Sequence, residues 1–379
     1  MQSTMQDVPL TVAAILRYAS TVHGDRTVTT ATGDGYRHAT YREVGRQAAR
    51  LANALRRLGV EGDDRVATFM WNNQEHLEAY VAVPSMGAVL HTLNIRLFPE
   101  QIEFVAYEAE DRVVIADLSL APILAPVLPK METVHTVVAV GAGDLEPFQR
   151  SGKNVVRYHD ITAAESDQFD WPAIDEKSAA AMCYTSGTTG HPKGVVYGHR
   201  STYLHSTAVC SGNGMGLSFS DKAFPIVPMF HANAWGLPYA ALMAGADILL
   251  PDRHMDAKTL VHMIETQRPT VAGAVPTIWN DVMNYLEREP GHDISSLRLV
   301  ACGGSAVPMS LMKTFEERHG VQIRQLWGMT ETSPTATLAW PPPGTPTARS
   351  WEIRGTQGRP MCGVETPIAD HEGAALPPA

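Results

Sequence analysis

A short segment, Tyr184 to Gly194, concentrates residues that suit a phosphate group. It reads Tyr-Thr-Ser-Gly-Thr-Thr-Gly-His-Pro-Lys-Gly and directly follows an apolar run. Glycines allow successive backbone N–H groups to converge on an anion, hydroxyls add donors, and a lysine adds a positive charge. The residues of these three kinds are Thr185, Ser186, Gly187, Thr188, Thr189, Gly190, Lys193 and Gly194. The segment therefore predicts a phosphate-binding loop, and it differs from the Walker pattern because no hydroxyl residue follows the lysine.

The eleven-residue string resembles the signature loop of the adenylate-forming family, which includes acyl-CoA synthetases, luciferases and peptide-synthetase adenylation domains. Two further segments are similar to family motifs in the expected order. Gly303-Gly304-Ser305-Ala306-Val307-Pro308 resembles the adenine-side loop. Gln325-Leu326-Trp327-Gly328-Met329-Thr330-Glu331-Thr332 resembles the Y-G-x-T-E motif, with Trp327 in the aromatic position. Within the family, the segments Val89 to Leu97 and Val227 to Tyr239 most resemble long-chain fatty acyl-CoA synthetases.

The resemblance implies a reaction in which a carboxylate attacks the α-phosphorus of ATP to give an acyl-adenylate, followed by thiolate attack from coenzyme A. It places Lys193 and the loop hydroxyls on the β- and γ-phosphates, Thr330 near the α-phosphate, and Thr185 with Glu331 on Mg²⁺. The adenine would lie between one wall formed by Gly303, Gly304 and Ser305 and another formed by Gln325, Leu326, Trp327, Gly328 and Met329. Taken alone, Glu331 reads as a carboxylate at a helix start, and the glycine pair as a tight turn before a helix.

His231 and Trp235 lie four residues apart in an otherwise apolar run. The resemblance places His231 near the acyl carboxylate and makes Trp235 the side chain that gates a fatty-acid tunnel. The alternative for Trp235 is plain core packing, because an indole among Leu, Ala and Tyr is usually buried for stability.

These residues need a scaffold, and the chain alternates apolar strand patterns with amphipathic helix patterns. The clearest helix covers 40–59: Thr40 and Glu43 form a capping box, and Gly59 ends it. Further strands are expected at 65–70, 113–117, 134–140, 178–184, 246–250, 270–274, 297–302 and 321–326, and helices at 74–86, 256–267, 277–288 and 308–318. The alternation predicts an α/β fold with mostly parallel sheets, and the resemblance implies the layered αβαβα arrangement.

The resemblance also divides the chain into a large domain, 1–340, with two similar and interleaved parts, about 1–177 and 178–340. The proline-rich run from Trp340 to Ser350 reads as a loop or linker. Two short strands at 358–369 and 371–376 would begin a β-barrel subdomain within 341–379. The family's mobile C-terminal domain, which would follow, is expected to be absent from these 379 residues, so we expect weak or no full activity from them. Two alternatives stay open: a nucleotide- or acyl-binding fragment without turnover, and a ligase for aryl or sterol-derived acids.

Composition limits the partners. The net charge is −10 without any basic run, which disfavours nucleic acid. No apolar stretch is long enough to span a bilayer and no signal peptide is evident, so we expect a cytoplasmic protein. The amphipathic stretch 10–22 favours a docked helix over peripheral membrane contact. The four cysteines are expected to be buried thiols, and the resemblance makes a homodimer plausible.

Overall fold

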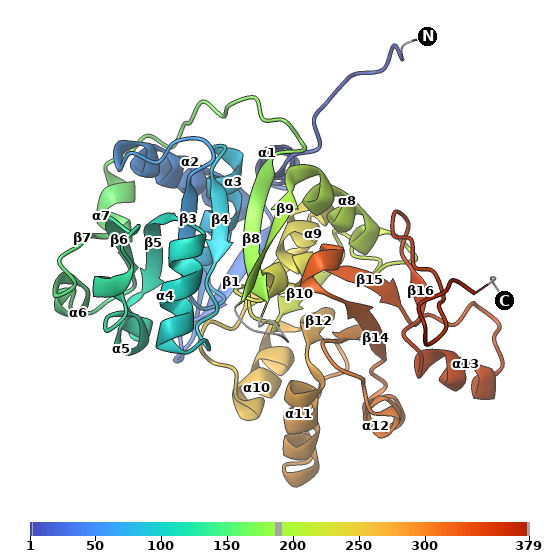
Figure 1. The fold of residues 1–379 in the computed structure, drawn as a ribbon. Helices are drawn as coiled ribbons and strands as arrows, with labels where there is room; N and C mark the ends of the chain where they lie inside the picture. Colours follow the sequence, from blue (N-terminus) through green and yellow to red (C-terminus); the bar gives the residue numbers. More distant parts are fainter. Residues whose placement is uncertain (2, 186–191, 377–379) are drawn as a thin grey trace.

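The computed structural model describes residues 1, 3–185 and 192–376, which form two mostly parallel sheets with helices between and around them (Figure 1). The first sheet has the order β7-β6-β5-β3-β4-β8-β9, and within it only β9 runs antiparallel to its neighbour. Its strands are β3 (Arg65–Phe69), β4 (Val89–Thr92), β5 (Asp111–Asp117), β6 (Thr136–Val140), β7 (Asn154–Arg157), β8 (Ala179–Thr185) and β9 (Lys193–Gly198).

The second sheet has the order β16-β15-β14-β13-β12-β10-β11-β1-β2. Its strands are β1 (Thr27–Ala31), β2 (Tyr36–Thr40), β10 (Lys222–Pro225), β11 (Asp247–Leu250), β12 (Val271–Ala274), β13 (Leu299–Cys302), β14 (Ile323–Gly328), β15 (Thr335–Leu338) and β16 (Arg359–Pro360). The strands β1 and β2 from the start of the chain therefore join the sheet of the second half. Conversely, β8 and β9 complete the sheet of the first half, so the two halves exchange strands.

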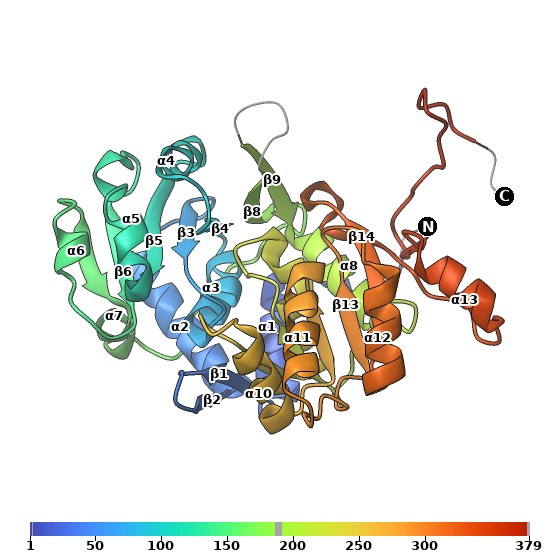
Figure 2. The same ribbon diagram turned by 90° about the horizontal axis from the view of Figure 1, so that it is seen from below.

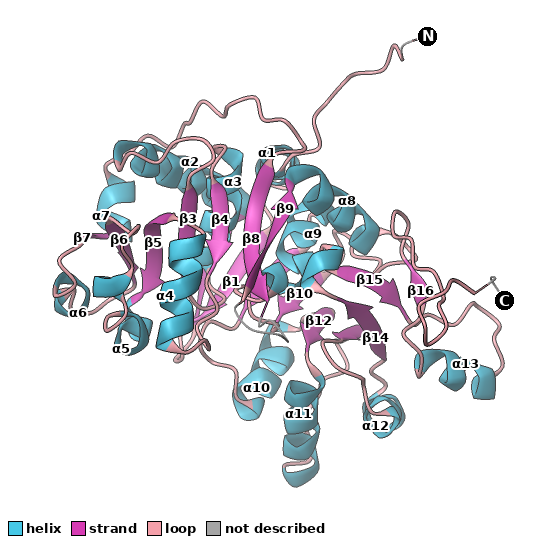
Figure 3. Ribbon diagram, in the orientation of Figure 1, coloured by secondary structure: helices cyan, strands magenta, loops and turns pink. Residues whose placement is uncertain are grey.

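The helices form three layers around the two sheets, and strand and helix alternate along most of the chain (Figure 3). They are α1 (Val12–Val22), α2 (Tyr41–Arg57), α3 (Gln74–Ser85), α4 (Pro99–Glu108), α5 (Ala121–Leu124), α6 (Glu146–Gln149), α7 (Tyr158–Ala163), α8 (His199–Cys210), α9 (Leu237–Ala244), α10 (Ala257–Gln267), α11 (Pro276–Arg288), α12 (Met309–His319) and α13 (Thr347–Arg354). One apolar core joins α1, α2, α3 and α9 to both sheets. A second core packs α10, α11 and α12 on the second sheet, and a third packs α4 and α5 on the first (Figure 2). The layered αβαβα fold predicted from the sequence is confirmed.

Local signals account for several helix ends. The capping box forms as expected, with the Thr40 hydroxyl accepting from the Glu43 N–H at 3.2 Å and the Glu43 carboxylate accepting from the Thr40 N–H at 2.7 Å. Gly59 follows α2 with φ +85°, a conformation that suits glycine. Asp256 caps α10 by accepting from Thr259 N–H at 3.0 Å. Helix α12 begins one residue later than expected, because Pro308 is its N-cap.

Helix α1 is a docked helix, since its apolar residues Val12, Ile15, Leu16 and Ala19 are buried and it contacts α2, α3 and α9. Within the described part of the chain, no helix is both long and apolar enough to cross a membrane.

Three expectations about the C-terminal part and the cysteines are wrong. The run after Trp340 is a loop only at first, because its last residues begin α13. The two expected C-terminal strands are reduced to the two-residue β16 and one antiparallel bridge between Ala369 and Ala375. Cys183 and Cys302 are buried and Cys210 is half-buried, but Cys362 is exposed because it lies in this sparsely packed tail.

Candidate functional site

The predicted phosphate loop joins two antiparallel strands, β8 and β9. Thr185 is the last residue of β8 and pairs with Lys193, the first residue of β9. Lys193 is exposed, and no described carboxylate lies within 4.0 Å of its ammonium group in an ion pair. The loop residues predicted to bind phosphate, Ser186, Gly187, Thr188, Thr189 and Gly190, lie outside the described residues. The structure therefore places the two ends of the loop, with the lysine open to a ligand.

Thr330, Glu331 and Thr332 form a single 3-10 turn, η4, between β14 and β15. Gly328 makes this turn possible, because a Cβ there would lie 2.0 Å from the Pro334 carbonyl oxygen. The Thr332 hydroxyl accepts from the Met329 N–H at 2.8 Å and so closes the turn. The sequence analysis assigned no role to Thr332. The second threonine directly after Glu331 was the only sequence signal for this turn-closing hydroxyl.

The turn η4 lies beside the β8–β9 hairpin, because Cα atoms of η4 and β8 approach within 8 Å. Burial raises the pKa of the Tyr197 phenol on β9, and the nearby Glu331 carboxylate raises it further. Glu331 itself is exposed. The structure thus brings η4, which carries Glu331, beside the β8–β9 hairpin, which carries Thr185 and Lys193 at its loop end.

The predicted adenine-side loop begins where β13 ends. A Cβ on Gly303 would lie 2.5 Å from Leu326 Cδ1 and 2.7 Å from the Leu326 carbonyl oxygen, so the first glycine allows β13 and β14 to pack closely. Gly304 has φ +83° and is exposed, together with Ser305. The first glycine therefore has a packing role and the second a turn role.

Gln325 lies on β14 opposite Cys302, the last residue of β13, and its side chain forms hydrogen bonds within the protein. Its Oε1 accepts from the Val307 N–H at 2.7 Å, and its Nε2 donates to the Thr356 carbonyl at 2.7 Å. The residue is 3% exposed. Gln325 thus holds the loop after β13 against the segment before β16, while Trp327 is half-buried and Met329 is exposed.

The predicted acyl-side residues follow β10. His231 is exposed at the surface; partial loss of solvation and the positive Arg96 both lower the pKa of its imidazole, so the ring is mostly neutral near pH 7. Arg96 also lies 6.0 Å from the centroid of the Phe230 ring. The sequence argument quoted the segment that contains Arg96 but assigned this residue no role.

Trp235 is buried in a turn of unusual handedness. The φ angles from Ala232 to Gly236 are all positive, between +43° and +68°. Left-handed backbone costs residues with a Cβ about 1–2 kcal/mol each, so tertiary contacts must hold this turn. The indole lies against Gly273 of β12, because a Cβ there would be 3.7 Å from its ring, and Trp235 is 6% exposed. Core packing is thus observed, while the gate role stays a prediction.

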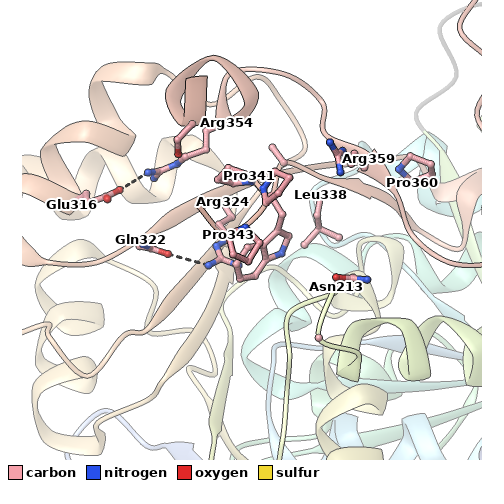
Figure 4. Close-up of a pocket in the computed structure, with 15 residues that line it drawn as sticks. Asn213, Glu316, Gln322, Arg324, Leu338, Pro341, Pro343, Arg354, Arg359 and Pro360 are labelled. Carbon is pink, nitrogen blue, oxygen red and sulfur yellow. Dashed lines mark hydrogen bonds and ion pairs between the residues drawn. The ribbon is translucent and has the colours of Figure 1, made fainter. Parts of the chain in front are cut away.

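A hollow of about 610 Å³ lies elsewhere, over β14, β15 and α13 (Figure 4). In it, Arg354 forms an ion pair with Glu316, and Arg324 donates to Gln322 at 3.0 Å. Its described lining contains none of the predicted site residues. We therefore assign the candidate active site to the region between the β8–β9 hairpin, η4 and the turn at 232–236.

Comparison with known proteins gives the class that this geometry supports. The model of the AMP-binding enzyme family matches residues 16–379, and the chain belongs to this family. Its relatives include CoA ligases of the AMP-forming type, which use ATP and CoA. The resemblance predicted from the motifs is confirmed.

Individual relatives differ in the acid that they activate. The chain is 38% identical to a 3-methylmercaptopropionyl-CoA ligase of Ruegeria lacuscaerulensis, across all of this chain and 70% of the relative. It is 38% identical to a medium-chain-fatty-acid–CoA ligase of Ectopseudomonas oleovorans, across all of this chain and 69% of the relative. It is 40% identical to a long-chain-fatty-acid–CoA ligase of Thermus thermophilus, across 99% of this chain and 68% of the relative.

Among solved structures, an anthranilate CoA ligase in complex with anthranoyl-AMP superposes with a TM-score of 0.86 at 25% identity. The match covers all of this chain and 69% of that one. The family is thus established, and the choice of acid is a separate question.

Proposed function

We propose that this chain carries the nucleotide and acyl sites of a fatty-acid–CoA ligase, which converts a medium- or long-chain fatty acid with ATP to acyl-AMP and then to acyl-CoA. One observation supports this most strongly: β8 lies between the two halves of the site. The strand, which ends at Thr185, contacts the η4 turn, and its Cys183 contacts Asn233 of the acyl-side turn. Two of the relatives reported above are named for fatty acids.

In this proposal, a carboxylate oxygen of the fatty acid attacks the α-phosphorus of ATP. A new P–O bond forms, the bond to the bridging oxygen of the β-phosphate breaks, and pyrophosphate leaves with the electron pair. The reaction depends on positioning and charge neutralisation. The Lys193 ammonium would neutralise the leaving phosphates, and Thr330 would lie near the α-phosphate. His231, which is neutral near pH 7, would lie near the acyl carboxylate beside the positive Arg96.

We propose Thr185 and Glu331 as the protein ligands of Mg²⁺. A hydroxyl and a carboxylate are the hard oxygen donors that this ion prefers, and few protein ligands are needed when ATP supplies the others. Thr185 is the last residue of β8, and Glu331 lies on η4, the turn that approaches this strand. When bound, the ion would neutralise charge on the phosphate oxygens.

The test is ATP–pyrophosphate exchange and acyl-CoA release by the purified chain, measured with fatty acids of increasing length and with aryl acids. Lys193→Ala should reduce exchange about 10²–10³-fold, the usual cost of one lost contact to developing charge. Lys258→Ala, an exposed lysine on α10, is the matched control and should leave exchange unchanged. Exchange with aryl acids alone would contradict the fatty-acid proposal. Binding of ATP and an acyl-adenylate analogue without exchange would favour a non-turnover fragment.

We also propose that the chain forms a homodimer, on the strength of the family resemblance alone. Sedimentation equilibrium tests this, and a monomer at all concentrations would contradict it. Vesicle flotation tests peripheral membrane contact. Because the apolar face of α1 is buried, such contact would need another surface.

A further inference from the structure

The left-handed turn at Ala232–Gly236 needs an external support. Four of its five residues carry a Cβ, which opposes positive φ. Asparagine visits this region more readily than most residues, whereas alanine and tryptophan do not. Asn233 is therefore the residue of the turn best suited to its backbone, and its side chain is also the one that bonds outward.

The Asn233 side chain contacts two strands of the first sheet. Its Oδ1 accepts from Cys183 Sγ at 3.1 Å and from Thr92 Oγ1 at 3.4 Å. Thr92 Oγ1 and Cys183 Sγ are also 3.3 Å apart. Burial raises the pKa of the Cys183 thiol to about 11, so the sulfur keeps its proton and can donate at neutral pH. We name Thr92, Cys183 and Asn233 the latch; each is at most 3% exposed.

The turn is also confined at its other end, and its geometry fixes Trp235. A Cβ on Gly236 would lie 2.5 Å from the Nδ1 atom of His205 on α8, so the backbone is pressed against that ring. Between the latch and this contact, Trp235 lies against Gly273. Any change in handedness of the turn would redirect the indole, because Cα–Cβ directions depend on the backbone conformation.

We propose that the latch positions the acyl site: by bonding to Asn233, Thr92 and Cys183 hold the left-handed turn and thereby fix the place of Trp235. This inference rests on the proposed function, in which Trp235 borders the fatty acid. Thr92 and Cys183 contact the turn and not the substrate, so they are positioning residues. Because Cys183 lies two residues before Thr185, the latch also joins the acyl-side turn to the strand that enters the phosphate loop.

The first test measures Trp235 directly and needs no ligand. Acrylamide quenching is recorded with and without Trp235→Phe in each background, because the chain has seven tryptophans. Thr92→Val and Cys183→Ala each remove one hydrogen-bond donor to Asn233. Thr92→Ser and Cys183→Ser each keep a hydroxyl donor at the same position. We expect Trp235 to be shielded in the parent and the serine variants. In the Thr92→Val/Cys183→Ala double variant, which loses both donors to Asn233, its quenching should rise clearly above that of the parent and the serine variants.

Thr92→Val alone serves if the double variant does not fold, because it removes one of the two donors and leaves every Cβ of the turn in place. A folded double variant or Thr92→Val variant in which Trp235 stays shielded would overturn the latch.

The second test measures binding of non-hydrolysable fatty-acyl-adenylate analogues of short, medium and long chains, together with ATP alone. Loss of the latch should flatten the chain-length preference about threefold to tenfold, while the affinity for ATP stays constant. A purely structural role would weaken all ligands alike. If the parent binds no fatty-acyl analogue, the proposed function fails, whereas the quenching result still decides whether the latch holds Trp235.

Discussion

Asn72 offers a sharp test of how the two sheets are held together at the site. It follows β3 and is 2% exposed. Its Nδ2 donates to the carbonyl oxygens of Pro225 at 2.8 Å and Val227 at 2.9 Å, and its Oδ1 accepts from the Met229 N–H at 2.7 Å. One amide therefore satisfies three backbone groups in the segment that leads to His231. Asn72→Ala removes all three bonds at once.

The magnitude follows from these partners. A buried polar group left without a partner costs about 1–3 kcal/mol, so three such groups would cost at least about 3 kcal/mol. A water molecule that enters the vacated space would offset part of this cost. We therefore expect Asn72→Ala to lower the free energy of unfolding by about 3–5 kcal/mol, a large share of the usual 5–15 kcal/mol. Asn72→Asp should not restore stability, because a carboxylate cannot donate to Pro225 and Val227.

Urea unfolding followed by circular dichroism measures the change. Asn53→Ala is the matched control, since Asn53 Nδ2 also donates to two carbonyls, those of Ser166 at 3.0 Å and Gln168 at 2.9 Å, but in contact with solvent. Water can replace these bonds, so the control should cost less than about 1 kcal/mol. If Asn72→Ala costs no more than Asn53→Ala, the reasoning about buried partners is refuted.

Three further predictions concern the turn, a buried acid and the indole. Gly328→Ala should displace η4 from the Pro334 carbonyl, destabilise the fold by about 1–3 kcal/mol and reduce pyrophosphate exchange, whereas Gly212→Ala, with open space around it, should change stability by less than about 0.5 kcal/mol. Burial raises the pKa of the Glu78 carboxyl from 4.5 to about 7. The folded chain therefore holds this proton more tightly than the unfolded chain, and the stability from Glu78 falls as pH rises from 4.5 to about 7; Glu78→Gln should remove that slope from unfolding curves measured across this range. Trp235→Ala should change the chain-length profile of exchange, and an unchanged profile with only lost stability would support core packing instead.

The fold was largely predictable because local and global signals agree. Thr40 and Glu43 specify the start of α2, and the apolar strand runs are short and bounded by turn residues. The exchange of strands between the sheets was not predictable from these signals, since the pairing of β1 with β11 depends on contacts far apart in the chain. The start of α13 was not predicted, because the prolines before Thr347 interrupt a helix or strand but are also tolerated where a helix begins.

The site was predictable as motifs and only partly as geometry. Glycine is the clearest example: Gly303 and Gly328 are both explained by protein atoms that would clash with a side chain, not by an observed ligand. A motif glycine can therefore serve the backbone arrangement that places Thr330 and Glu331. This explains why residue types alone indicated the chemistry but could not say which glycine would contact a nucleotide.

The turn at Ala232–Gly236 shows the opposite case, in which local sequence argues against the structure. Alanine and tryptophan oppose left-handed backbone, and the single asparagine is a weak signal for five consecutive positive φ angles. The turn exists because Asn233 bonds to strands β4 and β8 while Gly236 lies against His205. Conformations that tertiary contacts must impose cluster at functional sites. This left-handed turn contains Trp235 and directly follows His231. Its strained backbone is therefore an independent, structural reason to place the acyl site there.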